Sequence, residues 1–70
     1  MARSPSPKTL AKQLDQRIER LYGASCSGVQ IPMMSIGQVF QVGRTAASQG
    51  GTDEAVTAAI VAFVQTVRTN

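Results

Sequence analysis

The chain has 70 residues, of which 43% are hydrophobic, and it carries a formal net charge of +3, with no histidine and one cysteine, Cys26. A chain of this length forms one domain, and its apolar fraction is too high for a compositionally disordered segment. Histidine, the commonest general base and metal ligand, is absent from the sequence. A single cysteine excludes both an internal disulfide and a cysteine-based zinc site. We therefore expect no enzyme, no metal or other cofactor, and no small-molecule substrate.

The charge is concentrated at the start of the chain. Residues 1–22 hold five basic and two acidic side chains, and the remainder is neutral. We expect residues 1–5 to be a flexible N-terminal lead and residues 6–70 to form a single helical domain. The N-terminal segment lacks the apolar stretch of a secretory signal, and no stretch approaches the roughly 20 apolar residues that span a membrane. Together with the lone cysteine, this predicts a cytoplasmic protein without membrane contact.

The first predicted helix covers residues 7–22. Ser6 is a good N-cap, and Pro7 fits the first helical position because its missing N–H would be unpaired there. Gly23 is a natural stop. An apolar stripe recurs at spacings of four, four and three, at Leu10, Leu14, Ile18 and Leu21.

The opposite face of this helix is charged, with Lys8, Lys12, Asp15, Glu19 and Arg20. Lys12 and Asp15 are three residues apart and can form an ion pair. Because acidic and basic side chains are mixed, we interpret this face as a solvated outer surface.

Residues 23–34 are expected to form a connector that is irregular or briefly extended; residues 29–31 alternate like a short strand, which Pro32 would end. Cys26 lies in this connector, far from any activating cation or helix start, and is expected to be an inert thiol. Met33-Met34 is expected to seal the core where the connector enters the next helix.

The second predicted helix covers residues 35–49. Ser35 and Gln38 have the spacing of a capping box, and Gly50-Gly51 ends the helix. Gly43 lies on the apolar face, where its missing side chain lets another backbone approach closely. That face also contains Ile36, Val39, Phe40, Ala46 and Ala47.

The third predicted helix covers residues 52–69, with Thr52 as its cap and two acidic residues in the first turn. Residues 55–67 contain no charge, and apolar side chains go nearly all the way round the helix, which a surface helix does not show. The β-branched residues in 60–67 leave a buried strand open as an alternative. The acidic start and four alanines favour the helix.

These elements predict an all-α fold: a small three-helix domain with an irregular or briefly extended connector between the first two helices. The third helix is expected at the centre, packed by the other two and by a second subunit. The expected core contains Leu10, Leu14, Ile18, Leu21, Ile36, Val39, Phe40, Ala47, Val56, Ile60, Phe63, Val64 and Val67.

The first functional hypothesis is a small non-enzymatic interaction module, an adaptor or accessory subunit that forms a homodimer or binds a protein partner. It rests on the over-apolar third helix and on the missing catalytic residue types. The expected interface contains Val56, Ala59, Ile60, Val61, Phe63, Val64 and Val67.

The second hypothesis is a small dimeric DNA-binding regulator. The order of short strand, helix, glycine turn and helix over residues 28–69 resembles the layout of ribbon-helix-helix repressors. That resemblance implies an obligate dimer whose paired strands enter the major groove, although the VQIP segment offers only one polar side chain for reading bases. Phosphate contacts would come from the basic N-terminal segment. The candidate nucleic-acid contacts are Arg3, Lys8, Lys12, Arg17 and Gln30.

Overall fold

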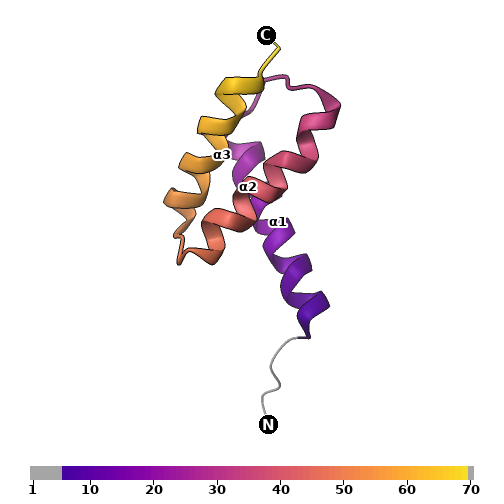
Figure 1. Cartoon of the computed structure of the whole chain (residues 1–70), viewed down its shortest axis with the longest axis vertical. Helices are drawn as coiled ribbons and strands as arrows, with labels where there is room; N and C mark the ends of the chain where they lie inside the picture. Colours follow the sequence, from indigo (N-terminus) through magenta and orange to yellow (C-terminus); the bar gives the residue numbers. More distant parts are fainter. Residues whose placement is uncertain (1–5, 70) are drawn as a thin grey trace.

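The computed structural model describes residues 6–69, and its regular elements are all helical (Figure 1). They are α1 (Pro7–Ser25), the 3-10 turn η1 (Met33–Ser35), α2 (Ile36–Ser48) and α3 (Asp53–Val67). No strand occurs among these residues. The predicted all-α domain of three helices is confirmed, and the predicted lead at 1–5 lies outside the described residues.

Helix α1 begins as predicted but ends three residues later. The Ser6 hydroxyl accepts a hydrogen bond from the backbone N–H of Thr9 at 3.2 Å. Gly23 does not adopt a positive φ, so the helix passes through it. The helix ends at Ser25, and its C-cap is Cys26, whose backbone N–H donates to the carbonyl of Tyr22 and whose side chain is buried.

The connector between α1 and α2 is irregular, so of the two forms left open for residues 29–31 the brief strand does not occur. The connector backbone is hydrogen-bonded to the residues that follow α3 and not to a second strand. The backbone N–H of Thr69 donates to the carbonyl of Gln30 at 2.8 Å. Val29 and Ile31 are half-buried and pack against the core. The segment therefore closes one end of the domain.

The start of α2 also differs from the prediction. Ser35 already has a helical backbone because η1 runs directly into α2, and its side chain makes no capping hydrogen bond. Ser35 is buried, whereas Met33 and Met34 are each 86% exposed. The prediction that this methionine pair seals the core is wrong, since the turn directs the serine inward.

Helices α2 and α3 form an antiparallel hairpin (Figure 1). Gly50 in their turn has φ +73°, a conformation that other residues rarely adopt. The hydroxyl of Thr52 accepts from the backbone N–H of Ala55 at 3.2 Å, as the predicted cap should. The alternative of a buried strand at 60–67 is excluded, because α3 is helical to Val67.

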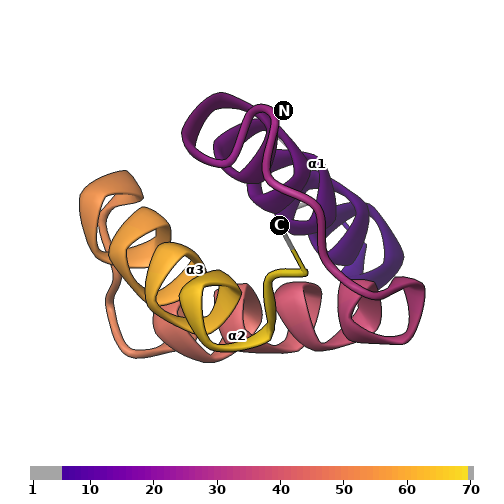
Figure 2. The same cartoon turned by 90° about the horizontal axis from the view of Figure 1, so that it is seen from above.

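All three helices contact one another, and Figure 2 shows their arrangement from above. The side chains between them form a small, mostly aliphatic core. The core prediction is wrong for Leu10, which is 51% exposed, and for Ile36, which is 44% exposed. Leu10 lies on the first turns of α1, which extend past the α2–α3 hairpin, and Ile36 is the first residue of α2. The buried hydrophobic residues are Ile18, Cys26, Val39, Val56, Ile60 and Val64.

The crossing of α1 and α2 depends on Gly43. A Cβ atom at this position would lie 2.8 Å from Cγ1 of Ile18, well inside van der Waals contact. Gly43 is closely approached, but by the side chain of Ile18, the largest fully buried side chain of α1, and not by another backbone as predicted.

Several of the largest side chains in the uncharged run of α3 are already buried within a single chain. Val56, Ile60 and Val64 are fully buried by α1 and α2, while Ala55 and Ala58 are exposed. A second subunit is therefore not needed to cover the aliphatic stripe of α3. Within residues 6–69, no helix combines the length and the apolar character that crossing a membrane requires.

Candidate functional site

The outer side of the α2–α3 hairpin carries a shallow groove without charged side chains. Its α2 side is one helical face, with residues recurring at three and four, and its α3 side is Ala59 with the half-buried Phe63 one turn later. The lining residues are Gln38, Gln41, Val42, Thr45, Ala46, Gln49, Ala59 and Phe63. A lining of uncharged amides with one aromatic side chain resembles the centre of a protein interface, where charged residues are depleted.

Only part of the predicted interface lies in this groove. Ala59 and Phe63 line it, while Val61 and Val67 are half-buried outside it. The interface prediction is wrong for three further residues. Val56, Ile60 and Val64 have no exposed surface within the single chain, so they cannot contact a partner. The uncharged run indicated that α3 is covered on several sides, but not which sides α1 and α2 cover.

The α2 side of the groove was missed by sequence reasoning. Gln38, Gln41, Thr45 and Gln49 are polar and were not separated from an ordinary solvated face. The available signal was the absence of charge, since an exposed helical face normally carries lysine or glutamate.

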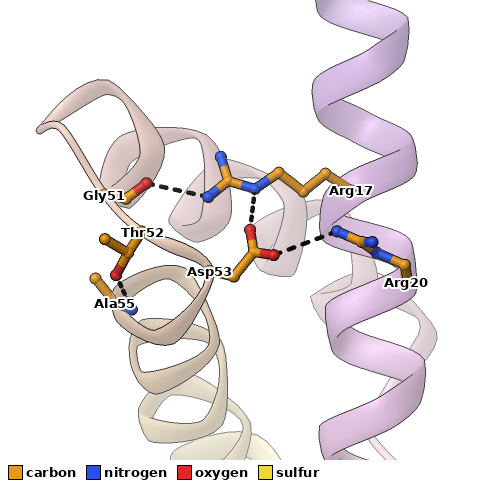
Figure 3. A network of polar contacts seen from close by, with 6 residues as sticks. All are labelled: Arg17, Arg20, Gly51, Thr52, Asp53 and Ala55. Carbon is orange, nitrogen blue, oxygen red and sulfur yellow. Dashed lines mark hydrogen bonds and ion pairs between the residues drawn. The ribbon is translucent and has the colours of Figure 1, made fainter.

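An ion-pair network joins α1 to the start of α3 (Figure 3). Nε of Arg17 donates to Oδ1 of Asp53 at 2.5 Å, and its Nη2 donates to the carbonyl of Gly51 at 3.0 Å. Nη2 of Arg20 reaches the other carboxylate oxygen at 3.4 Å. Both arginines therefore serve the packing of α1 against the α2–α3 turn.

This network gives Arg17, a predicted nucleic-acid contact, partners inside the chain. Its side chain is 28% exposed, and it shares the carboxylate of Asp53 with Arg20. Of the other candidates, Lys8 and Lys12 are exposed on the first turns of α1, and Arg3 lies outside the described residues. Gln30 is exposed but sits in irregular backbone, so residues 6–69 contain no ribbon of the kind that the ribbon-helix-helix layout implies.

A second groove lies between α1 and α2 and is charged. The guanidinium of Arg44 on α2 donates two hydrogen bonds of 2.9 Å to the carboxylate of Asp15 on α1. The same guanidinium lies 6.0 Å from the ring centroid of Phe40. The ion pair expected between Lys12 and Asp15 does not form, because Arg44 occupies the carboxylate. The groove is lined by Lys8, Ala11, Lys12, Asp15, Gln16, Glu19, Gly37, Phe40 and Arg44.

The described residues offer few groups for chemistry. Residues 6–69 contain no cluster of three or more cysteine, aspartate or glutamate side chains that could hold a metal ion. The thiol of Cys26 is 6% exposed and lies near the hydroxyl of Ser25, at 3.6 Å. The two grooves are the features from which function can be argued.

Comparison of the chain with protein-family models, with curated proteins and with solved structures finds no match.

Proposed function

We propose that this protein is a small non-enzymatic interaction module, an adaptor or accessory subunit that works as a homodimer and binds a protein partner in the α2–α3 groove. The observation that supports partner binding is the uncharged lining of that groove, which includes the half-buried Phe63. A partner that desolvates this surface buries no unpaired charge, which would otherwise oppose association.

The shape of the groove favours a helical segment as the bound part of the partner. The groove is lined by residues of two antiparallel helices, with the small Ala59 on its α3 side, and helices dock into grooves of this kind through side chains spaced by three and four residues. Gln38, Gln41 and Gln49 supply amide donors and acceptors along its length. The partner helix is therefore expected to present small apolar and uncharged polar side chains.

Site-specific photo-crosslinking in cells tests this proposal. A photoreactive residue at Gln38, inside the groove, should give a discrete adduct with a second protein, and the same residue at the exposed Gln13 of α1 should not. Thr45→Lys should abolish the adduct by placing a charge in the groove, whereas the matched Ala24→Lys on α1 should leave it intact. Equal labelling from Gln38 and Gln13, or an adduct insensitive to Thr45→Lys, would argue against the groove.

The DNA-binding hypothesis keeps one supporting observation, the exposed Lys8 and Lys12 on the first turns of α1. Its test is binding to duplex DNA at increasing salt, since phosphate contacts weaken steeply as counterions compete. Replacing both lysines by glutamine should remove such binding if this second proposal is correct. Salt-insensitive or absent binding would leave the interaction module as the better account.

A further inference from the structure

We infer that the homodimer forms through α1, with a second copy of this chain docked antiparallel along one charged stripe of the helix. The stripe contains Lys8, Lys12, Asp15 and Glu19, which are four, three and four residues apart and therefore share one face. All four line the groove between α1 and α2. The stripe is basic in its N-terminal half and acidic in its C-terminal half.

Two of the spacings in this stripe are unfavourable within a single helix. Lys8 and Lys12 are like charges four residues apart, and so are Asp15 and Glu19, which destabilises an isolated helix. Arg44 neutralises Asp15, but Lys8, Lys12 and Glu19 form no ion pair within residues 6–69. The stripe therefore presents charges that the rest of the described chain does not satisfy.

The other charged side of α1 shows a different pattern. Arg17 and Arg20 both reach Asp53, so the charges that face the hairpin are paired inside the chain (Figure 3). The contrast places the unsatisfied charges on the side of α1 that a neighbouring molecule can reach.

The spacing of the stripe is self-complementary for an antiparallel partner. A twofold axis between residues 13 and 14 places Lys8 opposite Glu19 of the second copy, and Lys12 opposite Asp15 of the second copy, whose carboxylate it would share with Arg44. Because the operation is a twofold, each pair forms twice. A parallel arrangement places like charges together, so the pattern selects both the direction and the register.

The surroundings of the stripe allow a second helix to approach. Ala11 and Gly37 are small, the half-buried Phe40 supplies apolar surface in the groove, and the first turns of α1 extend past the hairpin (Figure 1). Exposed ion pairs contribute little free energy individually. Their role here is to fix orientation and register, while Phe40 and Ala11 supply the apolar contact.

This inference rests on the proposed homodimer, and a charge-swap experiment tests the two separately. Lys8→Glu with Lys12→Glu makes the stripe wholly acidic, and Glu19→Lys makes it predominantly basic; Asp15 is kept because it holds Arg44. Each variant alone should dimerise at least about tenfold more weakly than the wild type at low salt. An equimolar mixture should form a heterodimer within a few-fold of the wild-type affinity. Glu54→Lys on α3 is the matched control, and circular dichroism checks that every variant keeps its helices.

The outcomes separate the two claims. If the wild-type chain is a monomer at all concentrations, the proposed homodimer fails and this interface with it. If the wild type is a dimer and the charge-swap variants are equally strong dimers, the homodimer stands and the α1 interface is wrong. If each variant is monomeric but the mixture does not pair, the antiparallel register is overturned.

Discussion

The α2–α3 hairpin and helix α1 contribute to the same core but present opposite surfaces. The outer groove of the hairpin is lined by amides, small residues and Phe63, without a charge. Helix α1 carries charged side chains on two sides, and its first turns lie beyond the hairpin (Figure 1). The difference shows how a chain of 70 residues can keep two chemically distinct surfaces on one small core.

The two regions also differ in how their charges are used. Where α1 faces the hairpin, Arg17, Arg20 and Asp53 pair inside the chain, and where it faces outward, Lys8 and Glu19 do not. The inner charges therefore hold the fold, and the outer ones are available for association. Substitutions on the two sides should separate stability from binding.

The largest expected effect is at the core position of α1. Ile18→Ala removes a fully buried side chain and leaves a cavity, which should lower the free energy of unfolding by about 2–5 kcal/mol. The matched Leu10→Ala, on the same helix at 51% exposure, should cost less than about 1 kcal/mol. Urea denaturation of both variants measures this, and equal losses would show that the first turns of α1 are packed like its centre.

The next effect is at the crossing of α1 and α2. Gly43→Ala places a Cβ 2.8 Å from Ile18, and such overpacking should cost about 1–3 kcal/mol, against a helix-propensity gain of up to about 1 kcal/mol. Gly37→Ala meets open space and should stabilise the protein by up to about 1 kcal/mol. Thermal unfolding compares the pair. A gain at both positions would contradict the close approach.

A smaller effect is expected in the network between α1 and α3. Arg17→Gln removes the bond to Asp53 and the bond to the Gly51 carbonyl, and should cost about 1 kcal/mol. Arg20 is 67% exposed and makes one long contact, so Arg20→Gln should stay within about 0.5 kcal/mol. A double-mutant cycle with Asp53→Asn isolates each pair. A larger coupling for Arg20 than for Arg17 would contradict the geometry.

The smallest effect is expected in η1. Met33→Gln and Met34→Gln should each change stability by less than about 0.5 kcal/mol, because both side chains are 86% exposed. Val39→Ala, a truncation of the nearby core residue at 2% exposure, serves as the buried comparison and should cost clearly more. Chemical denaturation of the three variants decides whether the methionines belong to the core.

Local sequence signals predicted the helices and some of their ends. Ser6 and Thr52 cap α1 and α3 as expected, since capping depends on a hydroxyl within three residues of its donor. Gly43 was identified from its place on an apolar face. Leu10 and Ile36 were placed in the core because periodicity gives the apolar face of a helix but not how far its neighbours extend.

The candidate site was predictable only in part for the same reason. Ala59 and Phe63 could be found from the uncharged run, whereas their groove partners on α2 depend on how the hairpin packs. The role of Arg17 depends on Asp53, 36 residues further along the chain, and no local pattern links them. Pairings of this kind are set by tertiary structure.

The most direct test of the central claim is the solution mass of the wild-type chain, by light scattering with reductant present, over a range of concentrations and at two salt concentrations. An α1 interface predicts a dimer, twice the 7.4 kDa chain, that dissociates more readily at high salt because ions screen its pairs. A monomer under all conditions, or a dimer that salt strengthens as it does apolar contacts, would contradict it.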